Sequence, residues 1–444
     1  MNRRGERAVV VGASVAGLLA TRVLADHFDR VTLIERDTKP NTAVVRKGVP
    51  QGNHVHNLLL RGMRILEEFF PGFVEEAQVA GAQMVNLGRE FLWYQHFGWK
   101  LHVPGDYDSL MLSRPLLEAV LDRRVQALPN IAIRDRSAVR TFRLDSKGAV
   151  SGVSLDDGTE IRADLVVDAT GRGSKLPKWL QSVGYPAVSE AHVKIDLGYA
   201  SQRFRRQPRV PDGGASIGDR WRAAAVVPTA PQTRGGAAFP IEDDQWLVTI
   251  GGCLGDHPPT DEAGFLEFAR SLPKSIVYET ISRTEPTSDI VGYRFPSDYR
   301  RYYERAILPR RLLVVGDSVC SLNPSFGQGM TVVAMQLEAV AHGLAEVSTE
   351  SLDNSIRGVQ KKIGRVVDAP WDVVVSEDLR HDATVGERNL RSRMIQWYST
   401  GLMRGANRDP KLAATFMELG NFICSPNTVF RPDVAARILA HRLY

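Results

Sequence analysis

The sequence predicts an α/β fold in which a parallel sheet is interrupted by an antiparallel β-sheet and followed by a helical C-terminal region. Three observations predict this fold class. A strand, a glycine turn, a helix and a second strand follow one another within residues 7–35, as in the βαβ unit of a parallel sheet. Alternating apolar and polar residues at 235–252 indicate antiparallel strands. A buried parallel-strand pattern returns at 311–317, and residues 346–444 are helical in pattern.

The elements can be placed in order along the chain from hydrophobic periodicity and turn residues. We expect strands at 7–11 and 30–35 around a helix at 18–24, a helix at 111–128, a hairpin at 138–144 and 150–155, a strand at 163–171, antiparallel strands within 184–292, a strand at 311–317 and a helix at 330–344.

Composition excludes several classes of protein. At roughly 150 residues per domain, a chain of 444 residues has room for two or three domains. A net charge of +5 is too small for this length to argue for a nucleic-acid partner. The chain has no apolar run of about 18 residues, so we expect no membrane-spanning helix and no membrane association. The three cysteines are far apart, which argues against a disulfide scaffold and a cysteine zinc site and favours a reducing cytoplasm.

The first motif is Gly12-Ala-Ser-Val-Ala-Gly17, which lies between a buried strand and an apolar helix. In a Rossmann-type site this spacing brings the backbone N–H groups of a helix N-terminus close to a pyrophosphate. Gly12 allows the tight turn, and Gly17 allows the helix and strand to pack closely. Ser14 stands where the pattern prefers glycine.

An acid follows this motif at the end of the second strand. Glu35 lies where a carboxylate accepts hydrogen bonds from ribose hydroxyls, and Arg36 beside it is a second expected cofactor contact. The motif and the acid together predict a dinucleotide site. On this evidence alone, an NAD protein or an S-adenosylmethionine protein stays an alternative.

A second glycine motif narrows the choice of cofactor. Gly316-Asp317-Ser318 follows a buried strand, and Pro324-Ser-Phe-Gly-Gln-Gly329 comes next. Asp317 stands at the carboxyl end of a parallel strand and can accept hydrogen bonds from a polyol chain. Gly327 and Gly329 expose backbone N–H groups at the start of a helix, which favours negative charge on a reduced flavin. A simple NAD domain has no use for this second site.

The set of motifs resembles the flavoprotein monooxygenases of the para-hydroxybenzoate hydroxylase fold, over roughly residues 7–345. The resemblance implies FAD as cofactor, with its ADP half near the first motif, its ribityl chain at Asp317 and its ring near Gly327 to Met330. It also implies that Arg114 approaches the pyrophosphate. The cofactor contacts expected are Gly12, Ser14, Gly17, Glu35, Arg36, Arg114, Asp317, Gly327, Gly329 and Met330.

The resemblance also implies a domain organisation. We expect an FAD-binding domain in three parts, a substrate domain of antiparallel sheet and a helical C-terminal region. The ranges are 1–75, 105–183 and 293–345 for the FAD-binding domain, 76–104 and 184–292 for the substrate domain, and 346–444 for the helical region.

Two further segments are similar to a narrower subgroup, the bacterial polyether epoxidases of the lasalocid and monensin type. They are the stretch from Arg46 to Leu59 and the pair Ala369-Pro-Trp-Asp372 and Glu377-Asp378. This resemblance implies epoxidation of an olefin. The central motif, Asp168-Ala-Thr-Gly-Arg-Gly-Ser174, departs from the family pattern GDGRxS, which leaves open whether NADH or NADPH is the reductant.

The expected function is therefore that of an FAD-dependent monooxygenase. It would use O₂ and NAD(P)H through a flavin C4a-hydroperoxide to epoxidise a small apolar substrate, such as a polyketide or a similar secondary metabolite. We expect Arg46, Pro324 and Gly327 as catalytic residues. The first alternative function is aromatic hydroxylation. Two further alternatives are a flavin-dependent olefin reductase of geranylgeranyl-reductase type and a non-catalytic flavin-binding protein.

The remaining patterns favour structural roles. His54-x-His56 lacks a third ligand nearby, so no metal site is expected. The stretch with Met394 and Trp397 has the pattern of a helix face packed on the core. Phe239 or Trp246, on the alternating segment, is expected to line the substrate pocket.

Overall fold

The computed structural model describes residues 4–40, 42–206, 221–346 and 352–443. The expected domain ranges 1–75, 184–292 and 346–444 each contain a stretch that lies outside the described residues.

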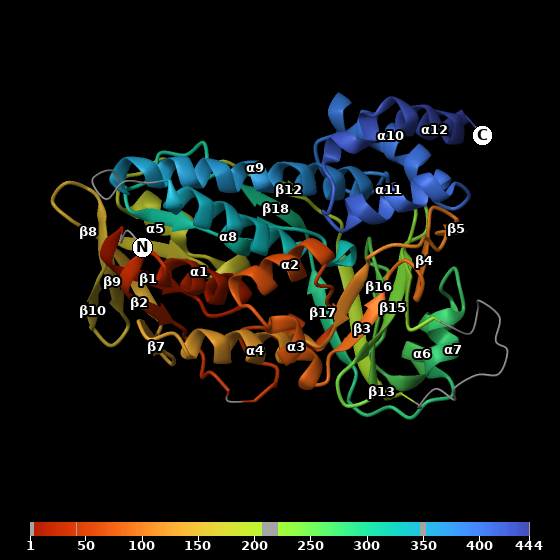
Figure 1. Cartoon of the computed structure of the whole chain (residues 1–444), viewed down its shortest axis with the longest axis horizontal. Helices are drawn as coiled ribbons and strands as arrows, with labels where there is room; N and C mark the ends of the chain where they lie inside the picture. Colours follow the sequence, from red (N-terminus) through yellow and green to blue (C-terminus); the bar gives the residue numbers. More distant parts are fainter. Residues whose placement is uncertain (1–3, 41, 207–220, 347–351, 444) are drawn as a thin grey trace.

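A five-stranded parallel sheet forms the part of the molecule on the left in Figure 1. Its core strands are apolar and buried on both faces, as parallel strands under helices must be. In spatial order the strands are β19 (Leu312–Val314), β11 (Leu165–Asp168), β1 (Gly5–Val11), β2 (Phe28–Ile34) and β7 (Ile131–Arg134).

The register of this sheet brings the sequence motifs together. Val11 at the end of β1 pairs with Asp168 at the end of β11, and Asp168 pairs with Val314 at the end of β19. Three strands therefore end level with one another. The segments that follow them begin at the same edge, which is where open α/β sheets bind ligands.

Within the described residues, seven helices belong to this part of the molecule, and α8 lies against α1, α2 and α9 (Figure 1). The expected helix at 111–128 begins later, because Met111 is still paired with Gln83 as the last residue of a strand. The helices are α1 (Val15–Ala25), α2 (Leu60–Phe69), α3 (Phe73–Val79), α4 (Arg114–Gln126), α5 (Leu176–Ser182), α8 (Gly329–Ala345) and α9 (Leu352–Asp378).

A seven-stranded sheet forms the lower right of Figure 1. All neighbouring pairs are antiparallel except β14 and β4, which are parallel. In spatial order the strands are β17 (Val291–Phe295), β13 (Leu197–Arg205), β16 (Gln245–Gly252), β15 (Arg234–Ile241), β14 (Ala223–Val226), β4 (Phe91–Gln95) and β5 (Gly98–Trp99).

Two helices that the sequence did not predict cover one face of this sheet. They are α6 (Glu262–Arg270) and α7 (Ile276–Ile281). Phe265 of α6 packs in one cluster with Val248 and Ile250 of β16. The opposite face of the sheet is free to line a cavity.

The remaining strands of the described ranges form three small sheets. The predicted hairpin is confirmed as β8 (Val139–Leu144) and β9 (Val150–Leu155), with β10 (Glu160–Arg162) beside β9. The other two sheets are β12 (Glu190–Val193) with β18 (Asp298–Arg301) and β20 (Cys320–Ser321), and β3 (Gln83–Asn86) with β6 (Asp108–Met111).

The chain ends in helices at the upper right of Figure 1, so the predicted fold class is confirmed. Lys100, just after β5, holds them to the sheet by donating hydrogen bonds to Met403 O at 2.6 Å and Asn407 Oδ1 at 2.8 Å. Burial lowers the pKa of Lys100 to about 7. The helices are α10 (Leu390–Gly405), α11 (Pro410–Gly420) and α12 (Pro432–Leu443).

One expectation for this region is wrong in part. Leu402 of α10 is buried, but Met394 is 62% and Trp397 is 47% exposed. The face does not pack wholly on the core, because the exposed residues stand at the opening of a cavity instead. Within the described residues, no helix has both the length and the apolar character needed to cross a bilayer.

Candidate active site

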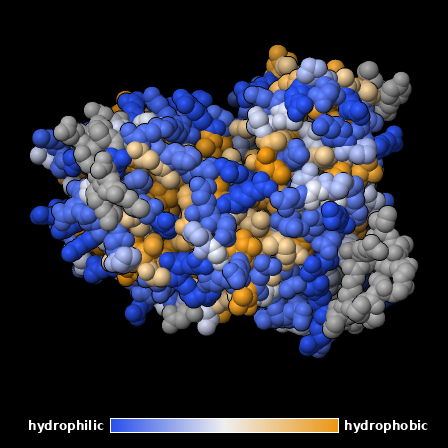
Figure 2. Space-filling view, viewed as in Figure 1, coloured by the Kyte–Doolittle hydropathy of each residue, from blue (hydrophilic) through white to orange (hydrophobic). Residues whose placement is uncertain are grey.

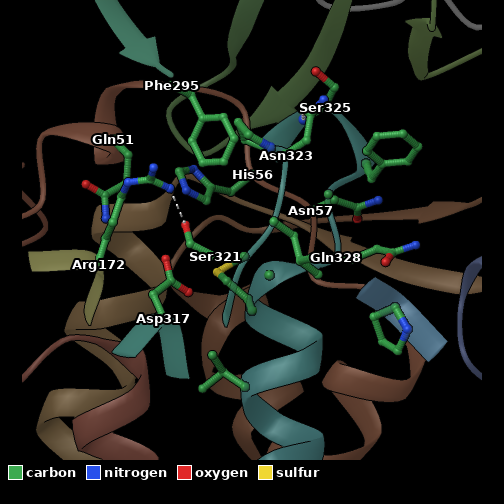
Figure 3. Close-up of a pocket in the computed structure, with 18 of the residues that line it drawn as sticks. Gln51, His56, Asn57, Arg172, Phe295, Asp317, Ser321, Asn323, Ser325 and Gln328 are labelled. Atoms are coloured by element: carbon green, nitrogen blue, oxygen red, sulfur yellow. Dashed lines mark hydrogen bonds between the residues drawn. The ribbon is translucent and has the colours of Figure 1, made fainter. Parts of the chain in front are cut away.

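A cavity of about 1850 Å³ lies where the parallel sheet, the seven-stranded sheet and the C-terminal helices meet. Its walls include the glycine turn, the loop 46–57, the segment 168–176 and the start of α8. Figure 3 shows one part of it, where Asp317, Asn57 and Gln328 lie around the N-terminal end of α8.

The glycine turn has the geometry that its sequence predicts. Gly12 has φ +98°, and a Cβ there would lie 2.6 Å from Ala169 O. A Cβ on Gly17 would lie 1.7 Å from Gly12 O, so only glycine permits this contact between helix and strand. The turn therefore presents bare backbone at the N-terminus of α1, as a pyrophosphate requires.

Ser14, the departure from the glycine pattern, is held by side chains of α4. Its Oγ donates to Glu118 Oε1 at 2.7 Å and accepts from the Arg114 guanidinium at 2.8 Å. Arg114 also donates to Glu118 at 2.9 Å. The hydroxyl thus joins the turn to the first residues of α4, a function that glycine could not perform.

Arg46 lies in the same cluster. It donates to Glu35 Oε2 at 3.1 Å, to Glu118 Oε2 at 2.8 Å and to Ala13 O at 3.1 Å. Glu35 also accepts from Ala13 N at 2.9 Å. The structure therefore places Arg46, expected to be catalytic, beside the glycine turn. There it fixes the acid that follows β2.

Charge on Glu118 is stabilised by this arrangement. Burial alone would raise the pKa of Glu118, but Arg114 and Arg46 outweigh burial and hold the pKa at about 2. Arg46 and Arg114 face Glu35 and Glu118, so two cations balance two anions. Arg36, in contrast, is exposed at the edge of the cavity.

The central motif turns its acid inward. Asp168 is 1% exposed and accepts from Thr170 N at 3.0 Å and from the hydroxyls of Thr170 and Ser174 at 2.5 Å. Arg172 points toward the cavity and donates to Ser321 Oγ at 3.2 Å (Figure 3). A Cβ on Gly171 would meet no atom within 4 Å, so bare backbone faces the cavity here too.

The late motif brings Asp317 and the start of α8 to the same cavity. Gly316, with φ +68°, makes the turn after β19, and its N–H donates to Gln336 Oε1 at 2.8 Å. Burial raises the pKa of Asp317. Pro324 begins a 3₁₀ turn that ends at Gly327, which has φ +64°.

The first turn of α8 is open toward the cavity. A Cβ on Gly329 would meet no atom within 4 Å, and Met330 beside it lines the same space. The N–H groups of this 17-residue helix therefore point their partial positive charge toward the cavity.

Among the described residues that line the cavity, five have a buried polar atom with no hydrogen-bond partner: Asp37 Oδ2, His54 Nε2, Asn57 Oδ1, Trp93 Nε1 and Gln328 Oε1. Buried polar groups are normally satisfied, so unpartnered atoms at a cavity wall indicate a polar ligand. Two open glycines, a helix N-terminus and these atoms together suit the phosphate, polyol and heterocycle of FAD. The residues present fit the cofactor.

The two histidines of the loop are uncharged at neutral pH. Burial, assisted by His56, lowers the pKa of His54 to about 3, and burial lowers that of His56 to about 4. His54 Nδ1 lies 2.7 Å from Ser201 Oγ, and its ring packs edge-on against Tyr199 at 4.5 Å. In the described part of the chain, no cluster of three His, Cys, Asp or Glu residues could hold a metal ion.

A pair of buried carboxyl groups supports the late motif from behind. Asn323, which precedes Pro324, donates through Nδ2 to Asp378 Oδ1 at 2.9 Å, and its backbone N–H donates to Asp298. Asp298 and Asp378 are hydrogen-bonded to each other. Burial raises the pKa of both, and for Asp378 the neighbouring Asp298 adds to the rise.

The seven-stranded sheet turns an apolar face to the cavity. Phe239 lines it, as expected, and meets Phe91 edge-on with ring centroids 5.8 Å apart. Trp246 does not, and this expectation is wrong. Thr249 and Gly251 of β16 line the cavity, and side chains alternate along a strand, so Trp246 lies on the other face with α6 and α7.

The sequence-predicted residues thus line one cavity apart from Trp246 and Gly17, and Gly17 is buried against Gly12 instead. Glu118 was missed, although its position four residues after Arg114 on a helix was a readable signal. Asn323, Asp298 and Asp378 were missed as a group, because residues so distant in sequence give no pattern. The unpartnered atoms of Asn57 and Gln328 could be found only in the fold.

Comparison with known proteins gives one family. A family model described as FAD binding domain matches residues 6–357, which is more than half of the chain.

Relatives and solved structures agree with that match. The chain is 31% identical to protein Rv3254 of Mycobacterium tuberculosis over 458 residues, covering 99% of this chain and 94% of that protein. It is 44% identical to kynurenine 3-monooxygenase of Salinispora tropica over 343 residues, covering 74% and 70%. p-Nitrophenol 4-monooxygenase PnpA of Pseudomonas putida has a TM-score of 0.61 at 18% identity, over 94% of this chain and 97% of that one, which shows a shared fold.

Proposed function

The chain belongs to the FAD binding domain family of flavin-dependent monooxygenases, and we propose that it epoxidises a carbon–carbon double bond of an apolar polyketide or similar metabolite. FAD is its cofactor. Molecular oxygen and NAD(P)H are the proposed co-substrates.

One observation carries the proposal: a single cavity joins the glycine turn, Asp317, the start of α8 and the apolar face of the seven-stranded sheet. A cofactor held by the first three would extend toward the fourth. The cofactor and an apolar substrate can therefore share one space.

The chain's own residues bind and orient rather than react. When bound and reduced, FAD activates O₂ and supplies one oxygen atom for transfer. Asp317 would accept hydrogen bonds from the ribityl hydroxyls, and the N-terminus of α8 would stabilise negative charge near Gly329. Phe239 and Phe91 would cover the apolar substrate and exclude water.

The proposed reductant is a nicotinamide dinucleotide. The central motif at 168–174 contributes to the choice between NADH and NADPH. The carboxylate of Asp168 is occupied by Thr170 and Ser174, so it is not available to a second nucleotide. Arg172 is the positively charged residue of this motif, and its side chain is available at the cavity. Rates of flavin reduction by NADH and NADPH decide between the two.

Epoxidation is supported by the subgroup resemblance at 46–59 and by the apolar sheet face. Aromatic hydroxylation is the second candidate, favoured by the similarity to kynurenine 3-monooxygenase. A cytoplasmic location is part of the proposal, because Cys253, Cys320 and Cys424 are all unpaired.

The test is incubation of the FAD-loaded protein with NADPH and a panel of polyenes and aromatic compounds under ¹⁸O₂. The proposal expects an epoxide, or the diol derived from it, that carries one labelled oxygen. A labelled phenol would establish the hydroxylase instead. A saturated, unlabelled product would establish the reductase, and a protein that acquires no FAD would overturn all three readings.

A further inference from the structure

The cavity extends well beyond the residues expected to hold FAD. Between the seven-stranded sheet and the C-terminal helices it forms what we call the apolar chamber, lined by Phe91, Trp93, Phe239, Leu402 and Phe416. Trp93 and Phe416 meet with ring centroids 4.8 Å apart, and they join the sheet to α11. The whole cavity, about 1850 Å³, exceeds the roughly 300–1,000 Å³ typical of one ligand site.

The walls of the chamber offer no charge to a ligand. None of the described residues of the seven-stranded sheet that line the cavity has a charged side chain. On the helical side, Glu377 and Arg380 pair with each other, with Nε and Oε2 2.7 Å apart, and Arg391 pairs with Asp372. An ionised substrate group would lose its hydration here without gaining a counter-ion, which is costly, because the unpartnered donor in the wall, Trp93 Nε1, is uncharged.

The chamber opens to solvent through an apolar rim. Leu390, Met394 and Trp397 of α10 and Phe430 line the cavity and are also 74%, 62%, 47% and 68% exposed. We call these four residues the rim. Figure 2 shows hydrophobic side chains at the surface over the C-terminal helices, at the upper right. Clustered exposed apolar side chains mark a surface that binds an apolar molecule.

The rim is held in place. Arg380 donates to Gln396 O at 2.8 Å and to the hydroxyls of Ser399 and Thr400 at 2.8 and 3.0 Å, which fixes α10 against the end of α9. Tyr398 stacks on Phe430 at 5.7 Å, and its hydroxyl donates to Val429 O at 2.5 Å. The opening is therefore a formed feature of the fold.

We propose that the apolar chamber binds an uncharged, extended substrate that is longer than a single ring and enters past Met394 and Trp397. This inference rests on the proposed function, because it names the class of molecule that receives the oxygen. The kind of reaction at the flavin end is a separate question.

The test uses the FAD-loaded protein and three probes. All-trans-retinol is neutral and extended, all-trans-retinoate has the same skeleton with a carboxylate, and benzyl alcohol is neutral with one ring. Binding is followed through the absorbance of the bound flavin and the fluorescence of retinol. We expect retinol to bind at least about tenfold more tightly than either of the others, a difference of about 1.4 kcal/mol.

Rim variants locate the binding site. Trp397→Asp and Met394→Asp should each weaken retinol binding about tenfold and leave FAD content unchanged. Val79→Asp is the matched control, because Val79 is 85% exposed and lies away from the cavity. Thermal melting confirms that each variant is folded. If one of the two rim variants does not fold, the other still tests the binding site.

The outcomes separate this inference from the proposed function. Equal or tighter binding of retinoate, or rim variants that bind retinol as the wild type does, would overturn the apolar chamber as the site. Retinol binding as expected, in a protein that transfers no labelled oxygen, would refute the proposed function and leave the chamber in place.

Discussion

The Arg114 guanidinium donates to the Ser14 hydroxyl at 2.8 Å, across 100 positions of the chain. The same Ser14 hydroxyl donates a hydrogen bond to Glu118 at 2.7 Å. Ser14→Ala should therefore loosen the turn at the cofactor site. We expect FAD to bind about three- to tenfold more weakly, since a hydrogen bond contributes about 0.5–1.5 kcal/mol. Flavin fluorescence titration measures this, and Ser182→Ala, at an exposed site, should change nothing.

Glu118→Gln should destabilise the protein by about 3 kcal/mol at pH 7, because two buried arginines lose their shared anion. The pKa of Glu118 falls from 4.5 to about 2 on folding, so its stabilisation is complete above pH 4.5. It is lost as the pH falls toward 2. Urea unfolding at several pH values should show the variant and the wild type converging in acid.

The control for that experiment is Glu76→Gln. Glu76 pairs with Arg123 and Arg124 on the surface, where such pairs contribute at most about 1 kcal/mol. Equal losses in the two variants would contradict the role given to Glu118.

His54 should make the folded protein sensitive to mild acid. Its pKa is 6.5 in the unfolded chain and about 3 in the fold, so below pH 6.5 protons bind the unfolded state preferentially. Stability should fall by about 3 kcal/mol between pH 6.5 and 4, at about 1.4 kcal/mol for each unit. His54→Gln should flatten this dependence in thermal melts, and an unchanged slope would exclude His54 as its source.

Asp317→Ala should abolish retention of FAD through purification. A hydrogen bond to a charged acceptor contributes about 1.5–3 kcal/mol, so the dissociation constant should rise roughly ten- to a hundredfold. Asp317→Asn, which keeps one carbonyl oxygen, should lie between alanine and the wild type. Asp289→Ala removes an exposed acid and should retain flavin fully.

Phe239 and Trp246 form a matched pair on opposite faces of the seven-stranded sheet. Phe239→Ala should lower kcat/KM for the best substrate about tenfold, because it removes part of the wall against Phe91. Trp246→Ala should leave kcat/KM within about twofold. The opposite result in steady-state kinetics would reverse the assignment of the two faces.

Much of the parallel-sheet part could be predicted from the sequence, because its signals are local. A buried strand followed by a glycine turn determines both the element and the position of its ligand-binding end, as at Gly12 and Gly316. The register of β1, β11 and β19 then follows from the fold class. The meeting of the three motifs at one edge is therefore a consequence of topology.

The rest depended on which side chains the fold brings together. The alternation at 235–252 predicted strands. The face of these strands that lines the cavity is the one that α6 and α7 leave uncovered, and the sequence pattern did not predict these two helices. The apolar pattern of α10 is the same for a helix face packed on the protein core and for one that surrounds the opening of a cavity, so the sequence does not distinguish the two. The pairing of Asp298 with Asp378 joins elements with no shared pattern, so it emerges only in three dimensions.

The contact of Asn323 with Asp378 also sets limits on exchanging parts between related proteins. Asp378 ends α9 and supports the segment in front of α8, whereas the rim and one wall of the chamber come later in the chain. A chimera that keeps this chain through Thr384 and takes its remaining helices from a relative would keep its support for FAD. It would acquire a new entrance, provided that the transplanted helices still offer Lys100 its two acceptors. Substrate choice could thus be changed by recombination with the cofactor machinery left untouched.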